Sequence, residues 1–136
     1  MLKPVALTVL LLTSSAFATQ ADAKQPLGQI KPVTQGLLAV GIADEIRNQC
    51  PTISARVWRA AKFVKKLKSR ANSLGYSDDE IRAFRKSSAE KAKMRAKGEA
   101  YLKENGVSKG LPESYCALGR AEIAKSSQIG ALLRAK

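Results

Sequence analysis

The sequence lacks histidine entirely, has only two cysteines, and has few aromatic residues, which make up 5% of its 136 positions. Histidine is the usual general base and metal ligand near neutral pH, so its absence argues against most hydrolytic and metal-dependent sites. Zinc needs about four ligands, which two cysteines alone do not supply. We therefore expect no metal and no cofactor. The scarcity of aromatic side chains also removes the stacking platforms that nucleic-acid binders use.

Long apolar runs are also missing. The longest one near the start, Pro4 to Leu12, is about half of the ~20 residues that a membrane-spanning helix needs. It follows Lys3 and precedes small and polar residues, which is the layout of a secretory signal peptide. We predict a signal peptide over residues 1–18, with an alternative end at 23. The mature protein is then expected to be soluble, periplasmic and not transmembrane.

The two cysteines, Cys50 and Cys116, are the minimum for one disulfide in an exported protein. The sequence has no Cys-x-x-Cys redox pair. We predict a structural disulfide that ties the end of the first helix to the start of the last.

Helical periodicity covers most of the chain, and strand signals are absent. Proline-rich residues 24–34 predict an extended N-terminal arm. Residues 35–136 predict one all-α domain, a small bundle of four to five helices with one disulfide. Apolar residues recur at helical spacing in two segments: Leu38, Ile42, Ile46 and Cys50 in the first, and Val57, Ala61, Val64, Leu67, Ala71 and Leu74 in the second.

Helix boundaries are signalled most clearly at Ser77, which is followed three residues later by Glu80 in a capping box. A similar pattern at 87–90 predicts a kink or restart inside a helical stretch from Asp78 to about Glu104. A last helix is expected from Pro112 or Glu113 to near the C-terminus.

Three glycines fall inside predicted helices, where each costs about 1 kcal/mol relative to alanine. They are Gly41, Gly119 and Gly130. Close helix packing is the simplest explanation. Gly41 and Gly119 also lie in similar contexts, "AVGIADEI" and "ALGRAEI", so we predict that the first and last helices pack through these glycines.

Basic residues dominate the charge, which is +13 in total. The segment "RVWRAAKFVKKLKSR", residues 56–70, holds seven Lys or Arg and no acid. We predict a surface for an anionic protein or lipid partner, and not for nucleic acid, because the chain is expected to be exported. Its candidate residues are Arg59, Lys62, Lys65, Lys66, Arg82, Lys86, Lys93 and Lys97. The other interpretation, which the charge pattern by itself favours, is a solvated basic face that binds nothing. Trp58 beside it is interpreted as a core-edge residue, with a docking anchor as the alternative.

Candidate catalytic groups are few. Asp44 and Glu45 are adjacent in a helix and point to different sides, so their spacing does not make an acid–base pair. We expect one of them to pair with Arg120 or Lys125 inside the bundle. The sequence therefore favours a protein that is not an enzyme, with no catalytic residues.

Four segments resemble a family of small exported alphaproteobacterial proteins known only as a domain of unknown function. They are "AVGIADEIRNQCPTISAR", "LGYSDDEI", "AEKAKMRAKGEAYL" and "YCALGRAEIAKSSQIGALLRAK". The likeness covers nearly the whole mature chain and both cysteines. It implies no activity or cofactor, but it suggests an accessory or assembly factor linked to the respiratory NADH dehydrogenase.

The leading hypothesis is an exported, non-enzymatic interaction or accessory protein whose basic surface meets an anionic envelope partner. A periplasmic stress chaperone is the alternative by analogy of shape. An enzyme of unrecognised type is a third hypothesis.

Overall fold

The computed structural model describes residues 24–136, so the predicted signal peptide lies outside the described residues. In chain order the elements are η1 (Leu27–Gln29), α1 (Lys31–Gln49), β1 (Ile53–Ala55), α2 (Val57–Ser73), α3 (Asp78–Lys86), α4 (Ser88–Glu104), α5 (Pro112–Ala124), η2 (Gly130–Leu132) and β2 (Leu133–Ala135). Five helices with one disulfide confirm the predicted all-α bundle.

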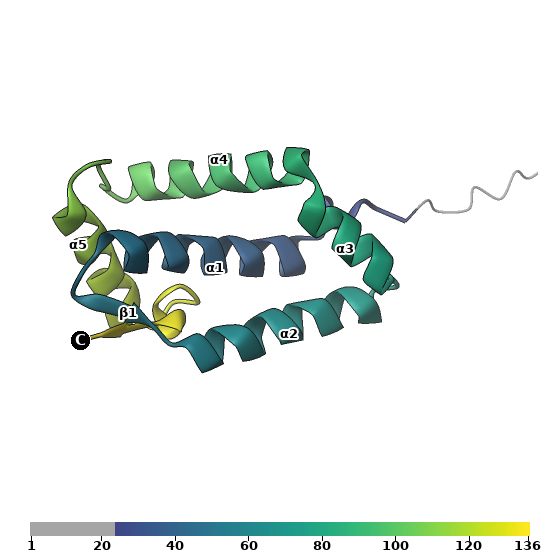
Figure 1. Cartoon of the computed structure of the whole chain (residues 1–136), viewed down its shortest axis with the longest axis horizontal. Helices are drawn as coiled ribbons and strands as arrows, with labels where there is room; N and C mark the ends of the chain where they lie inside the picture. The colour runs from purple at the N-terminus through teal and green to yellow at the C-terminus, as the bar shows by residue number, and fades with distance from the viewer. Residues whose placement is uncertain (1–23) are drawn as a thin grey trace, which may run out of the picture.

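Helix α1 is the centre of the fold. It lies between α2 and α4, and α5 crosses it near its C-terminal end (Figure 1). Ile42, Ile46 and Cys50 are buried, which confirms the predicted apolar stripe, although Leu38 is only half-buried. Because α1 packs against three helices, it contributes more buried apolar side chains to the core than any other element.

The N-terminal segment differs from the predicted arm. Residues 24–34 are not extended throughout, because η1 and the first turn of α1 lie within them. Pro32 is accommodated in that first turn, where a helix needs no backbone donor. Leu27 and Val33 are buried with Tyr76 in a second, smaller core cluster. The burial of these two side chains explains why the segment docks on the bundle.

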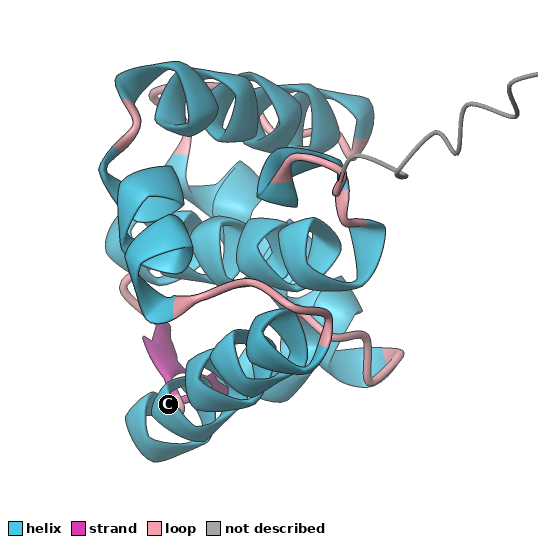
Figure 2. Cartoon of the chain, turned by 90° about the vertical axis from the view of Figure 1, so that its right-hand side faces the viewer, coloured by secondary structure: helices cyan, strands magenta, loops and turns pink. Residues whose placement is uncertain are grey.

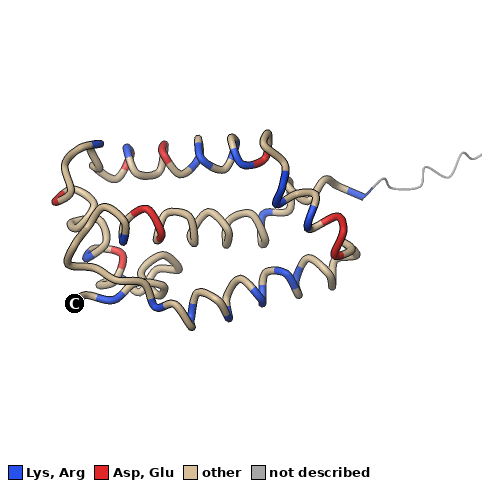
Figure 3. Tube along the Cα trace, viewed as in Figure 1, with Lys and Arg blue, Asp and Glu red and all other residues tan. Residues whose placement is uncertain are grey.

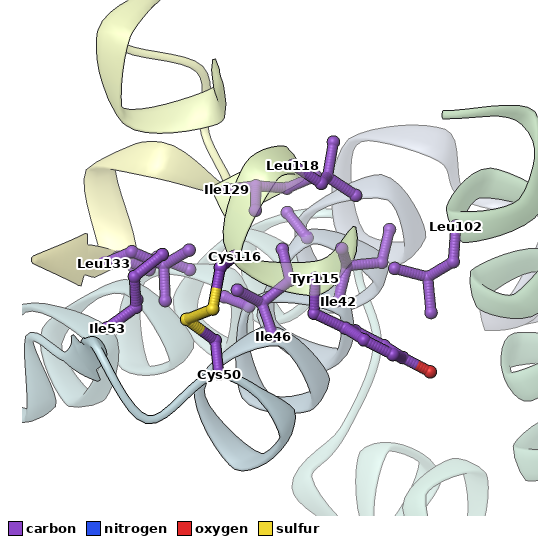
Figure 4. Close-up of a cluster of buried hydrophobic side chains, with 13 residues drawn as sticks. Ile42, Ile46, Cys50, Ile53, Leu102, Tyr115, Cys116, Leu118, Ile129 and Leu133 are labelled. Atoms are coloured by element: carbon purple, nitrogen blue, oxygen red, sulfur yellow. A yellow bond between two sulfur atoms is a disulfide. The ribbon is translucent and has the colours of Figure 1, made fainter. Parts of the chain in front are cut away.

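The predicted disulfide is present. Cys50, at the end of α1, is joined to Cys116 of α5 with an S–S length of 2.05 Å and a Cα–Cα distance of 5.1 Å. Both cysteines are buried, and Figure 4 shows the sulfur atoms among apolar side chains that include Ile46, Ile53 and Leu133. The bond is part of the main hydrophobic core.

The three predicted helix starts after residue 76 are present, and α5 begins at Pro112 as expected. Ser77 and Glu80 form a complete capping box. The Ser87 side chain accepts a hydrogen bond from the backbone of Glu90 and begins α4. The stretch is therefore two helices, because Ser87 has an extended backbone conformation and interrupts the helical bonding between α3 and α4.

The C-terminal part departs from the predicted long helix. Helix α5 ends at Ala124, and Ser126 takes a positive φ of 50° that breaks the helix. The chain then returns as η2 and β2, and β2 pairs antiparallel with β1. Figure 2 shows this short two-stranded sheet beside the helices. This return of the chain brings Leu132 and Leu133 into the core.

The three glycines do not share one role. A side chain at Gly119 would overlap Ile53 and Ile46, and one at Gly130 would overlap the backbone of Glu122, so both confirm close packing. The prediction for Gly41 is wrong, because a Cβ there would meet nothing within 4 Å. Gly36, one and a half turns earlier on α1, is the glycine that contacts α2. The first and last helices thus pack through one glycine and not through two.

We predict opposite effects of two Gly→Ala substitutions on the free energy of unfolding. Gly41→Ala should stabilise by about 1 kcal/mol, because alanine favours the helix and finds open space. Gly130→Ala should destabilise by about 3 kcal/mol, because the new methyl group meets backbone that cannot move aside. Urea denaturation of both oxidised proteins measures the two changes. Equal stability of the two variants would contradict this account of the packing.

The disulfide should contribute about 4 kcal/mol, because it closes a 66-residue separation in the unfolded chain. We expect the double variant Cys50→Ala, Cys116→Ala to lose that amount in urea denaturation without reductant. Adding reductant should destabilise the natural protein by a similar amount and leave the variant unchanged. If reductant also destabilised the variant, the loss of stability in the natural protein could not be assigned to this disulfide.

Candidate functional site

Helix α2 packs on α1 with a different face from the one that the sequence predicted. Its buried and half-buried side chains are Ala60, Phe63, Leu67 and Ala71, whereas Val57 and Val64 of the predicted core stripe are exposed. Both sets have helical spacing, but Phe63 buries more apolar area than a valine. The face that contains Phe63 therefore packs on α1. The predicted stripe is confirmed at Leu67 and Ala71 and is wrong in its first half and at Leu74, which is exposed.

This rotation directs Trp58 away from the bundle. Trp58 is 84% exposed, so its interpretation as a core-edge residue is wrong. Trp58, Lys62 and Lys65 are spaced i, i+4 and i+7, which places them in one row on the side opposite the buried face. Val57, Ala61 and Val64 run beside that row. We call these six residues the outer face of α2.

The positive charge of α2 is concentrated and largely unneutralised. Figure 3 shows Lys and Arg along the whole helix with no acid between them. Within the described residues, Lys68 pairs with Asp78 at 3.1 Å, while Lys62, Lys65 and Lys66 make no ion pair. The outer face therefore carries uncompensated positive charge through Lys62 and Lys65, and Lys66 adds to the positive potential of the helix.

Two arginines hold the start of α2 in place. The Arg56 Nε donates to the Leu133 carbonyl oxygen at 3.0 Å, and the Arg59 Nη1 donates to the Ala131 carbonyl oxygen at 3.1 Å. Arg59 belonged to the predicted surface. It is exposed, but it also has this structural role, which Lys62, Lys65 and Lys66 do not share.

The other predicted surface residues lie elsewhere. Arg82 and Lys86 are on α3, and Lys93 and Lys97 are on α4, which runs along the opposite side of α1 from α2 (Figures 1 and 3). The break at Ser87 separates the two pairs, so they do not share a continuous helix face. Arg82 also pairs with Asp79 and Lys93 with Glu90. The eight residues thus form no single surface.

A groove of about 590 Å³ lies between α1 and α4. Gly41 and Gly98 line it, together with apolar side chains that include Leu38, Ile42 and Met94. Its charged lining residues are Lys91, Arg95, Lys109, Glu45 and Glu99, and Lys109 pairs with Glu99 at 3.2 Å. Three positive and two negative side chains nearly cancel, so the lining of the groove carries less net charge than α2 does.

Glu122 is the one carboxylate buried from solvent among the described residues, with 0% exposure. Its oxygens accept hydrogen bonds from Tyr101 at 2.6 Å and from Ser127, and Lys125 pairs with it at 2.9 Å. Burial alone raises the pKa of the Glu122 carboxyl. The bonds from Ser127, Tyr101 and Lys125 outweigh it, so the pKa lies below the ordinary value.

The Glu122 cluster is therefore a structural joint that ties α4, α5 and the loop before η2 together. The predicted pairing of Asp44 or Glu45 with Arg120 or Lys125 is wrong, because Asp44 pairs with Arg47, and Arg120 pairs with Glu113. Sequence analysis missed Glu122. Its position three residues after Gly119, on the buried stripe of α5, was the available signal.

Metal-binding groups, free cysteines and membrane-spanning helices are not found in residues 24–136. No group of three or more Cys, Asp or Glu there could hold a metal ion, and both cysteines are in the disulfide. No helix in that range combines the length and apolar character needed to cross a bilayer.

Comparison with known proteins gives one match. A family described as "Family of unknown function (DUF5333)" matches residues 25–134, which is most of the described chain. No curated protein and no solved structure matches.

The Glu122 cluster should make stability depend on pH at both ends of the range. Folding lowers the pKa of Glu122 and raises that of Tyr101 to about 12, mainly through burial and then through the bond to Glu122. The folded protein therefore favours the ionised form of Glu122 and the protonated form of Tyr101. Stability should fall as pH drops through the folded pKa of Glu122, and as pH rises from about 10 to 12.

Urea denaturation across pH tests this, with Glu122→Gln as the comparison. The variant should be less stable near pH 7 by about 1–3 kcal/mol, because glutamine cannot satisfy the same donors. It should also lose part of the acid dependence, and the pKa of Tyr101 should move back toward 10. Identical pH profiles for the two proteins would contradict the assigned role.

Proposed function

The chain belongs to the DUF5333 family of unknown function, and we propose that it is a non-enzymatic periplasmic protein that binds an anionic envelope partner through α2. The observation that carries the proposal is the charge on this helix. Residues 56–70 hold seven cations and no acid, and three exposed lysines there make no ion pair within the described residues.

The same residues contribute little to the core, which supports a binding role. Lys62, Lys65 and Lys66 are exposed and make no ion pair within the described residues, so folding does not require their charge. Self-repulsion between like charges at helical spacing even opposes folding slightly. An anionic partner would relieve that repulsion.

Preorganisation supports the proposal further. Arg56 and Arg59 hold α2 to the C-terminal segment, and Leu67 and Ala71 bury its second half. A charged surface on a fixed helix loses little conformational freedom on binding.

A non-enzymatic role is consistent with the bonds that the potentially reactive side chains already make within the protein. Cys50 and Cys116 are consumed in the disulfide, and the buried Glu122 carboxylate is bonded to Tyr101, Ser127 and Lys125. The disulfide is also what an oxidising compartment such as the periplasm permits. The chaperone role and the link to the NADH dehydrogenase stay predictions.

We expect charge reversal on α2 to weaken polyanion binding more than the same reversal on α4. The test variant is Lys62→Glu, Lys65→Glu, Lys66→Glu. The matched control is Lys91→Glu, Lys97→Glu, Lys103→Glu, which changes net charge equally on the opposite side of α1. On immobilised heparin the α2 variant should elute at lower salt than the control. Equal elution would show that net charge alone matters and would overturn the proposed site.

A further inference from the structure

We propose that the anionic partner is a lipid bilayer, and that α2 lies along its surface with Trp58 at the level of the lipid headgroups. This inference rests on the function proposed above and specifies the partner of the same helix. It is carried by the apolar side chains that the outer face leaves exposed.

The outer face has the composition of an interfacial helix. Val57 is 68% exposed, Trp58 84% and Val64 41%, and they lie within two turns of one another. Helices that lie in a membrane surface combine an apolar strip of this kind with Lys and Arg on its polar side. Because a separate face with Phe63 and Leu67 packs on α1, this strip remains available while the bundle is folded.

The placement of Trp58 in one row with two lysines is the most informative detail. Lys62 follows it by one turn and Lys65 by two, both on the same row of the helix. Tryptophan favours the boundary between hydrocarbon and water, where its ring is buried and its N–H stays hydrated. Lysine ammonium groups on flexible stems reach the phosphates from the same depth. The row therefore matches the layered chemistry of an anionic bilayer.

A lipid surface fits these residues better than a protein partner does. Lysine is depleted in protein interfaces, whereas four of the seven cations in residues 56–70 are lysines. The helix spans about 25 Å, so its cations can contact several headgroups in a row. The exposed apolar strip is small, and binding should be reversible and sensitive to salt.

Trp58 is the only tryptophan in the chain and can report its own environment. The experiment adds vesicles of phosphatidylcholine, with and without phosphatidylglycerol, to the full domain and records Trp58 emission together with cosedimentation. We expect binding and a shift of emission to shorter wavelength only with phosphatidylglycerol. Neutralising Lys62, Lys65 and Lys66 to Gln should weaken binding roughly 100-fold, at about five-fold per lysine.

Trp58→Ala separates insertion from simple charge attraction. Its folding should be unchanged, because the ring is exposed, and circular dichroism checks this. The variant should bind anionic vesicles more weakly than the natural protein. The matched α4 variant of Lys91, Lys97 and Lys103, here changed to Gln, should retain most of the binding and the emission shift.

The outcomes distinguish this inference from the proposed function. Vesicle binding with no emission shift and no effect of Trp58→Ala would overturn the membrane orientation and leave an electrostatic surface. Failure to bind anionic vesicles, with α2-dependent binding to heparin or to an envelope protein, would overturn the lipid partner alone. Failure with every polyanion would overturn both.

Discussion

The bond between Cys50 and Cys116 is the constraint on which the rest of the structure depends. It holds the end of α1 against α5 at a Cα separation of 5.1 Å, and the turn into β1 follows immediately. The Thr52 hydroxyl lies 3.3 Å from the Cys50 sulfur and 3.8 Å from the Cys116 sulfur. Strand β1 follows this turn and pairs with β2, and α2 begins two residues after β1. The disulfide therefore anchors the segment from which α2 leaves the core.

The two sides of helix α2 have different roles. One side supplies the side chains that pack on α1, and the other carries charge and apolar surface that the core does not use. A helix that is apolar on one stripe usually buries all of it. Here the buried stripe includes Phe63, whose large ring fills the contact between α2 and α1. Val57 and Val64 therefore stay exposed to solvent. Evolution could therefore change the outer side with little effect on the fold.

Sequence patterns predicted the local features well and the tertiary choices poorly. The capping box at Ser77 depends on residues three apart, and the disulfide depends on the number of cysteines and the expected compartment, so both could be inferred. Which of two helical stripes on α2 faces α1 depends on the shape of α1, including the space left by Gly36. Gly41 could not be placed from the sequence for the same reason. Its neighbours in the sequence resemble those of Gly119, but in the fold it lines the groove between α1 and α4. Glu122 was missed because its burial depends on tertiary packing, and because its partner Tyr101 lies on α4, 21 residues away, although Lys125 and Ser127 are close in the sequence.

The pairing of β1 with β2 has a consequence for the order in which this molecule assembles. Ser54 and Arg134 are neighbours in the sheet but lie 80 residues apart in the chain. Leu132 and Leu133, adjoining that pairing, are among the most completely buried side chains. Contacts across such a separation form late, because a long loop must first close. Individual helices can form as the polypeptide emerges from a ribosome or a translocation channel, but one side of the core stays open until residues 132–135 arrive. During that interval the unfinished chain exposes an apolar surface that the finished protein does not have.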